Sequence, residues 1–291
     1  METQLDYYSQ TKSNRMKKLI KEIFERNNNT HSGFFPNKFF ADEFIDKLFN
    51  LLFVNGAVKY KTIEEITVEY QELEAQFFQL LLSSETNEEN AEHICSEFFK
   101  NIPALYSKAI RDAKAILAFD PAAHSLDEVL HVYPGFYAIA VHRISHYLWQ
   151  SDLPSLSRLF AEKAHSKTGI DIHPGALIGD DFAIDHGTGI VIGETAVIGS
   201  RVKIYQGVTL GAVNVAKEKA SEKRHPTIED DVIIYGNATI LGGSTTIGRE
   251  SVIGGNVWLT SSVPAFSVVF HKSEIKIKSN FPFEEPINFI I

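Results

Sequence analysis

The sequence predicts an α+β protein. We expect an N-terminal all-helical domain over residues 1–167, then a left-handed parallel β-helix of hexapeptide repeats over residues 168–265. Two patterns indicate this division. Upstream, apolar residues recur three and four positions apart, which is the period of a helix face. Downstream, an aliphatic residue recurs at every sixth position over about 90 residues, which is typical of a β-helix. Residues 266–291 are expected to form a C-terminal tail.

The composition limits the possible functions. The 291 residues are 44% hydrophobic and carry a net charge of −9, so we expect a large core and no nucleic-acid partner. No apolar stretch approaches the roughly 20 residues of a membrane helix, and the N-terminus lacks an apolar signal core. The single cysteine, Cys95, cannot form an internal disulfide. These features predict a cytoplasmic protein without a membrane partner.

The helical part carries recognisable start signals. Thr62 with Glu65, and Ser125 with Glu128, have the spacing of capping boxes. Behind the first box an apolar stripe indicates a helix face: Ile66, Tyr70, Leu73, Phe77 and Leu80. Four residues are expected to separate neighbouring helices: Asn29, Gly56, Asn87 and Pro103.

A buried helix is predicted over residues 136–149. His142 and His146 lie four apart within it, so they share one helix face. Two histidines alone are a weak metal signal, and packing or capping is the favoured interpretation.

The hexapeptide period runs through most of the second part. Its aliphatic positions are Ile172, Ile178, Ile184, Ile192, Ile198, Ile204, Leu210, Ile228, Ile234, Ile240, Ile247, Ile253 and Leu259. The phase slips by two near Ile190 and by one before Ile247. Three hexapeptides close one coil of 18 residues, and stacked coils bring the inward residues into ladders. Residues 212–227 have no phase and are basic, so we expect a loop that protrudes from one coil.

Polar residues in the β-helix offer a catalytic group. Asp171 and His186 are 15 residues apart, which allows them to lie on adjacent coils near one corner. An aspartate that fixes the imidazole tautomer leaves the other nitrogen basic, so His186 could act as a general base. Spacing alone favours the alternative that Asp171, Asp185 and His186 cap turns. A zinc site formed by His173, His186 and His225 is a further alternative, although their spacing matches no local zinc pattern.

Longer motifs are more specific than the hexapeptide period. The chain reads GIDIHPGALIGDDFAIDHGTGIVIGETAVIGSRVKIYQGVTLGA over residues 169–212, preceded by DPAAHS from Asp120 and YPGFYAIAVHRISH from Tyr133. Later it reads TILGGSTTIG from Thr239 and IGGNVWLT from Ile253. These stretches closely resemble the serine O-acetyltransferase family over roughly residues 110–265. Residues 1–105 fit only by being helical.

The resemblance implies roles for individual residues. It makes His186 the general base toward the serine hydroxyl and Asp171 its orienting partner. Asp120 and Asp185 would hold the ammonium of serine. The substrate carboxylate would pair with Arg224, with His225 as a second contact; a planar guanidinium suits that pairing. No metal or permanently bound cofactor is implied, because the thioester of the co-substrate acetyl-CoA is already activated.

The family also implies an assembly and partners. The cleft would lie between β-helices of a homotrimer, which the helical domain can join into a dimer of trimers. Three glycines are expected to admit the pantetheine arm of CoA: Gly211, Gly236 and Gly254. Cysteine is an expected feedback inhibitor at the serine site. Asn288 and the terminal Ile291 resemble the ending that binds O-acetylserine sulfhydrylase.

The chain departs from the family pattern at two places. After Pro264 it lacks the Gly-rich segment that flanks CoA in the family, which bears on the CoA contacts of this region and not on the serine site. The loop before Lys223 is also less Gly-rich than in many relatives. Alternative functions are acetylation of another small acceptor, a non-catalytic scaffold for the sulfhydrylase, and a zinc-dependent lyase. The carboxylates and Arg224 favour a zwitterionic acceptor such as serine over a neutral sugar.

Overall fold

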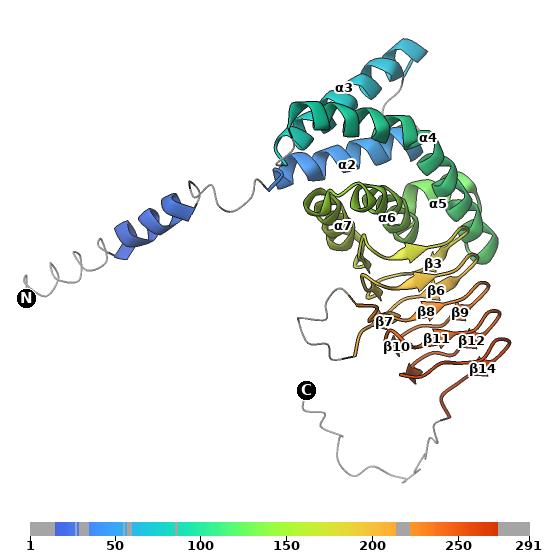
Figure 1. The fold of residues 1–291 in the computed structure, drawn as a ribbon. Helices are drawn as coiled ribbons and strands as arrows, with labels where there is room; N and C mark the ends of the chain where they lie inside the picture. Colours follow the sequence, from blue (N-terminus) through green and yellow to red (C-terminus); the bar gives the residue numbers. More distant parts are fainter. Residues whose placement is uncertain are drawn as a thin grey trace, which may run out of the picture.

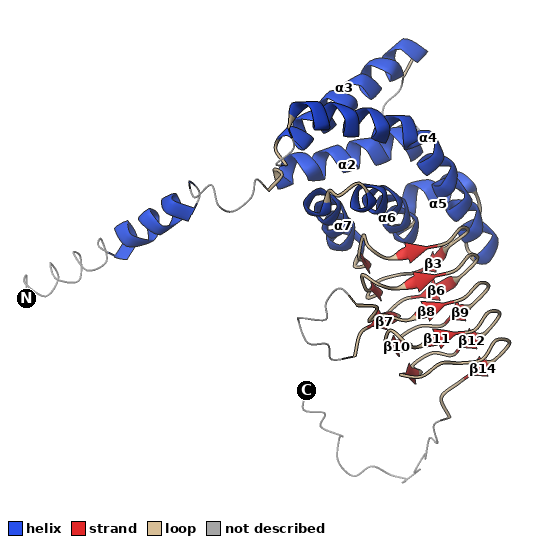
Figure 2. Ribbon diagram, viewed as in Figure 1, coloured by secondary structure: helices blue, strands red, loops and turns tan. Residues whose placement is uncertain are grey.

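A computed structural model describes residues 15–26, 28, 35–54, 56, 60–84, 87–213 and 222–272. Helices occupy the N-terminal part and cover one end of a column of short strands (Figure 1). Figure 2 shows the same division by secondary structure, with every labelled strand in the C-terminal part. The predicted fold class is therefore confirmed: a helical region precedes a parallel β-solenoid. Within the described residues, no helix is both long and apolar enough to cross a membrane.

The helical region is built around stacked aromatic rings. Its elements are α2 (Lys38–Phe53), α3 (Ile63–Leu82), α4 (Glu88–Phe119), α5 (Leu126–Val132), α6 (Pro134–Gln150) and α7 (Pro154–Thr168). Phe77 stacks on Phe44 from α2 and on Phe98 from α4, with ring centroids 5.3 and 4.4 Å apart. All three rings are fully buried. Burial of such large apolar side chains is the main force that holds these helices together.

Both predicted capping boxes are confirmed. Thr62 caps α3 by accepting a hydrogen bond from the backbone N–H of Glu65. Ser125 caps α5 in the same way, and the Glu128 carboxylate accepts a hydrogen bond from the His124 N–H at 2.8 Å. Asn87 caps α4. Gly56 lies between α2 and α3 with a φ of +84°, whereas Asn29 lies outside the described residues.

The predicted break at Pro103 is wrong, because Pro103 lies inside α4, a helix of 32 residues. Proline has no N–H, so the carbonyl of Phe99, four residues earlier, loses its helical partner. The Tyr70 hydroxyl of α3 donates to that carbonyl at 3.2 Å. A side chain from the neighbouring helix therefore satisfies the group that the proline leaves free.

The strands form three parallel sheets, one on each face of a triangular coil. The first sheet has the order β1-β4-β7-β10-β13, the second β11-β8-β5-β2 and the third β14-β12-β9-β6-β3. Their bounds are β1 (Asp171–Ile172), β2 (Leu177–Ile178), β3 (Ala183–Asp185), β4 (Val191–Ile192), β5 (Val197–Ile198), β6 (Lys203–Tyr205), β7 (Thr209–Gly211), β8 (Thr227–Ile228), β9 (Ile233–Ile234), β10 (Thr239–Leu241), β11 (Thr246–Ile247), β12 (Val252–Ile253), β13 (Trp258–Leu259) and β14 (Val268–Val269). The predicted aliphatic positions are all buried except Leu259, which is half-buried in the last coil.

The register explains the phase slips. Ile172 pairs with Ile192, so the first coil takes 20 residues, and the two extra residues lie between β3 and β4. Ile192 pairs with Leu210, which restores the 18-residue coil. The expected loop leaves between β7 and β8. The column also extends beyond residue 265, because Val268 of β14 pairs with Val252.

Three helices reach the first coil: α4 and α6 contact β3, and α7 contacts β1. Gly135, near the start of α6, lies against β3 so closely that a Cβ there would meet the Ile184 carbonyl oxygen at 2.7 Å. Any larger residue would push α6 away from β3. The N-terminal end of α6 is therefore fixed beside the strand that leads to His186.

Candidate active site

His186 lies at the corner between the third and first sheets, directly after β3. Its φ is +55°, a left-handed conformation that a residue other than glycine rarely adopts. The two residues that lengthen the first coil belong to this corner. The side chain is 72% exposed on the isolated chain. Asn237 and Asn256 take the same conformation at this corner of later coils, so the exposed imidazole, not the backbone, marks His186 as a candidate.

Asp185 is the carboxylate beside the imidazole. Its Oδ1 lies 3.6 Å from Nδ1 of His186. The expected pairing of Asp171 with His186 is not among the hydrogen bonds and ion pairs of the described residues; Asp171 lies on β1, paired in register with Val191. The orienting role of Asp171 stays a prediction.

Asp120 reaches the same corner from the C-terminal end of α4. Its carboxylate accepts a 2.7 Å hydrogen bond from the Tyr133 hydroxyl and a 2.8 Å bond from the Ala122 N–H. The bond from Tyr133 is the main cause that lowers the pKa of Asp120, and the charge of His186 acts in the same direction. The same bond raises the pKa of Tyr133 to about 12. Asp120 is thus held as a carboxylate beside the imidazole.

Aromatic residues that sequence reasoning missed line this corner. Tyr205 of β6 pairs in register with Asp185, and its ring stacks on Tyr235 with centroids 4.9 Å apart. Phe119 packs edge-on against Tyr205 from α4. The sequence signal for them would have been tyrosines at the ends of β6 and β9, at positions that the hexapeptide period does not direct into the core. These aromatic side chains lie beside Asp185 on the following coils.

Gly236 and Gly254 follow the third-sheet strands β9 and β12, as His186 follows β3. They therefore lie on the same edge of the column as His186. Gln206 lies on this edge in the coil between those of His186 and Gly236. A Cβ at Gly236 would lie 2.9 Å from the Gln206 amide nitrogen. Gly211 ends β7 in the first sheet, at the next edge. The structure thus groups two of the three expected CoA glycines with His186.

Arg224 and His225 lie at that next edge, between the first and second sheets. The Arg224 guanidinium pairs with Glu194. Nδ1 of His225 accepts the Thr195 N–H at 3.1 Å, so its proton must be on Nε2. Burial lowers the pKa of His225 to about 4, and the Arg224 charge adds to this. His225 is therefore a neutral donor near pH 7.

A cavity of about 500 Å³ lies beside these two residues, with His146, Trp149, Glu194, Thr195 and Lys223 among its lining. One face of the column, roughly 15 Å at 3.3 Å per residue, separates this edge from His186. One chain thus brings together Asp120, Asp185 and His186 but holds Arg224 and His225 apart from them.

The alternative metal sites gain no support from the geometry. In the described part of the chain, no group of three or more histidine, cysteine or acidic side chains is arranged to hold a metal ion. His142 is buried in α6, and Nδ1 of His146 lies 2.7 Å from the Pro174 carbonyl oxygen. His186 and His225 lie at different edges.

Comparison with known proteins places this geometry in a family. The family model described as "Serine acetyltransferase, N-terminal" matches residues 57–141. The similarity therefore extends into residues 57–105, where the sequence motifs indicate only helices. The serine acetyltransferase of Bacillus subtilis is 48% identical over 158 residues, which cover 54% of this chain and 70% of that protein. The chain belongs to the serine acetyltransferase family. A plasmid-encoded serine acetyltransferase of Synechococcus elongatus is 51% identical over 197 residues; the match spans 66% of this chain and 60% of that protein.

Solved structures of serine acetyltransferases align with most of this chain. The crystal structure of isoform 3 from Entamoeba histolytica in complex with cysteine aligns with a TM-score of 0.72 and 34% identity, over 81% of this chain and 84% of that one. The enzyme from Neisseria gonorrhoeae in complex with serine aligns with a TM-score of 0.56 and 28% identity, over 81% and 95% of the two chains. Both the helical region and the β-solenoid are thus features of the family.

Proposed function

We propose that this chain transfers the acetyl group of acetyl-CoA to the hydroxyl of L-serine and releases O-acetylserine and CoA. The observation that carries the proposal is the grouping of the His186 imidazole with the Asp120 and Asp185 carboxylates, in a member of the serine acetyltransferase family. An imidazole is the usual general base near neutral pH. Two carboxylates beside it suit the ammonium of an amino acid.

The proposed reaction needs one base. His186 removes the proton of the serine hydroxyl as the oxygen attacks the thioester carbonyl. A C–O bond forms, the C–S bond then breaks, and His186 returns its proton to the leaving sulfur. Tyr133 keeps Asp120 oriented toward the ammonium through its 2.7 Å hydrogen bond. We retain Asp171 as an orienting residue, on the basis of the family resemblance alone.

We further propose that a complete serine site needs two copies of the chain. Arg224 and His225 suit the substrate carboxylate, yet they lie one face away from His186 on the same column. In a homotrimer, the edge of one column that carries His225 can meet the edge of the next that carries His186.

The CoA arm is proposed to follow the edge below His186. Beyond Gln206, Gly236 and Gly254 leave two successive coils of that edge without a side chain, and small residues let an extended ligand approach the backbone closely. Gly211 lies at the edge of Arg224 and His225, so it would contact CoA only from the neighbouring copy.

Cysteine is proposed to compete with serine, because the two amino acids present the same ammonium and carboxylate. Relatives have been crystallised with cysteine and with serine. O-acetylserine sulfhydrylase is a proposed partner through Asn288 and Ile291, which lie outside the described residues. Deletion of Ile291 should abolish its co-elution with the sulfhydrylase while serine acetylation continues.

The test of the activity is release of the CoA thiol from acetyl-CoA with L-serine, in chelator, beside a panel of other acceptors. Serine-dependent release that collapses in His186→Ala supports the proposal. Release with another acceptor alone rejects serine as the substrate, and no release from folded protein rejects catalysis.

The shared site has its own test. His186→Ala and Arg224→Ala chains are mixed, unfolded and refolded together. Random trimers then hold both intact residues at about a quarter of their sites. Recovery of about that fraction of wild-type activity supports a shared site, and no recovery refutes it.

A further inference from the structure

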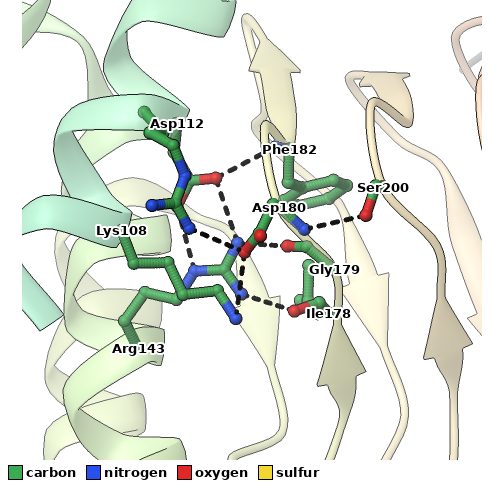
Figure 3. Close-up of polar contacts among 9 residues, drawn as sticks. Lys108, Asp112, Arg143, Ile178, Gly179, Asp180, Phe182 and Ser200 are labelled. Carbon is green, nitrogen blue, oxygen red and sulfur yellow. Dashed lines mark hydrogen bonds and ion pairs between the residues drawn. The ribbon is translucent and has the colours of Figure 1, made fainter. Parts of the chain in front are cut away.

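A buried ion pair joins the helices to the first coil of the column. Asp112 of α4 and Arg143 of α6 are 0% and 5% exposed. Two nitrogens of the guanidinium donate to the two carboxylate oxygens at 2.9 and 3.0 Å, as Figure 3 shows. A charged pair in such an environment needs all of its hydrogen-bonding groups satisfied. The remaining bonds of both side chains go to the turn that precedes β3.

These bonds reach three backbone groups of the first coil. Arg143 donates to the carbonyl oxygens of Ile178 and Gly179, each at 2.6 Å, and Asp112 accepts the Phe182 N–H at 3.0 Å (Figure 3). β2 and β3 are the end strands of their sheets, so their outer backbone groups have no neighbouring strand. Burial raises the pKa of the Asp112 carboxyl, while Arg143 and the Phe182 N–H oppose that rise.

Each element that this pair joins also carries a residue of the active-site corner. Asp120 is the C-cap of the helix that holds Asp112. Tyr133 is the N-cap of the helix that holds Arg143. β3, which begins directly after Phe182, ends at Asp185 and leads to His186. One ion pair therefore ties together the three segments whose relative placement sets the site.

We propose that Asp112 and Arg143 are positioning residues of the serine site. The pair holds α4, α6 and β3 so that Asp120 faces Asp185 and His186. This inference rests on the proposed function. Neither side chain touches the reacting atoms. Their effect would pass through backbone: a shift of β3 moves His186, and a shift of α4 moves Asp120. The CoA edge lies in later coils that the pair does not contact, so its geometry should be independent of the pair.

A surface ion pair in the same region supplies a matched control. The Asp180 carboxylate is half-exposed and pairs with Lys108 of α4 at 3.4 Å (Figure 3). It also pairs with Arg111 of the same helix at 3.1 Å. It joins the same helix to the same turn. Its link to the next coil is made by its backbone N–H, which donates to Ser200. Asp180→Asn thus removes a neighbouring charge pair and leaves the buried one intact.

The experiment compares Asp112→Asn, Arg143→Lys and Asp180→Asn with the wild type in the CoA-release assay, with each substrate varied in turn. Loss of the buried pair should raise the KM for serine about tenfold or more and leave the KM for acetyl-CoA within about twofold. Asp180→Asn should leave both unchanged. If the pair had a purely structural role, its loss would lower the yield of folded protein or kcat. The KM for serine and the KM for acetyl-CoA would then not change by different factors. A serine KM within about twofold of wild type in folded Asp112→Asn and Arg143→Lys overturns the proposal.

Two additions keep the outcomes distinct. Where a single variant does not fold, Asp112→Asn with Arg143→Gln removes both charges and leaves no lone buried ion. Failure of all three to fold, while Asp180→Asn folds, assigns the pair to stability alone. Hydrogen exchange judges the inference even if the wild type does not acetylate serine. Exchange in Asp112→Asn should rise over 120–124 and 183–187 but not over 233–259, and unchanged exchange over the first two ranges refutes the positioning role.

Discussion

Acid should destabilise this protein through His225 more than through an ordinary histidine. The Thr195 N–H donates to Nδ1, so a proton on that nitrogen would place two donors face to face. The ring is only 7% exposed, and its pKa is lowered to about 4 from 6.5. Since the unfolded chain binds this proton first, stability is lost as pH falls from about 6.5 toward 4. At pH 4.5 the linkage amounts to about 2.5 kcal/mol.

The variant that isolates this effect is His225→Asn, because the asparagine Oδ1 can accept the Thr195 N–H and does not titrate. Urea unfolding of both proteins is followed from pH 7.5 to 4.5. The wild type should lose about 2–3 kcal/mol more unfolding free energy than the variant over that range. The exposed His165→Asn serves as control and should give a curve parallel to the wild type. Parallel curves for His225→Asn would refute the buried, neutral state of His225.

Three further predictions follow from single contacts. Tyr133→Phe removes the hydrogen bond that lowers the pKa of Asp120, so steady-state kinetics should show a serine KM roughly fivefold higher and a deficit that grows as pH falls toward the ordinary aspartate range near 4. Gly193→Ala places a Cβ 2.0 Å from the His225 ring, so it should displace that ring and lower kcat/KM for serine by about tenfold or more, whereas unchanged kinetics would contradict the contact. Tyr70→Phe leaves the Phe99 carbonyl without its donor and should lower the urea-unfolding free energy by about 1–2 kcal/mol, while Tyr106→Phe, a half-exposed control, should change it little.

Local signals predicted the helix starts and the inward ladders well. The capping boxes depend on residues three apart, and the ladders on a strict period, so both are visible in one dimension. Pro103 was misinterpreted because the donor to Phe99 comes from Tyr70, which is distant in sequence. A tertiary contact that replaces a lost helical bond has no local signature.

The candidate site was only partly predictable for a similar reason. Motif resemblance identified His186, Asp120 and Asp185, and the structure brings these together. Tyr205 was missed because outward positions of a hexapeptide follow no rule of their own. The separation of His225 from His186 depends on which edge of the column each turn occupies. The hexapeptide period assigns a turn to an edge, but the loop before His225 has no period, so the edge of His225 cannot be read from the sequence.

The departures from the repeat are more informative than the repeat itself. Two extra residues lengthen the corner that holds His186. The loop between β7 and β8 ends in Arg224 and His225. The single extra residue before Ile247 belongs to the turn that contains Gly243, where a Cβ would lie 2.1 Å from the Lys223 carbonyl oxygen. That turn therefore supports the base of the loop. A regular hexapeptide coil satisfies its own backbone and buries its own aliphatics, so an extra residue has no role in packing. Each interruption of the period here either holds a candidate site residue or supports a segment that does.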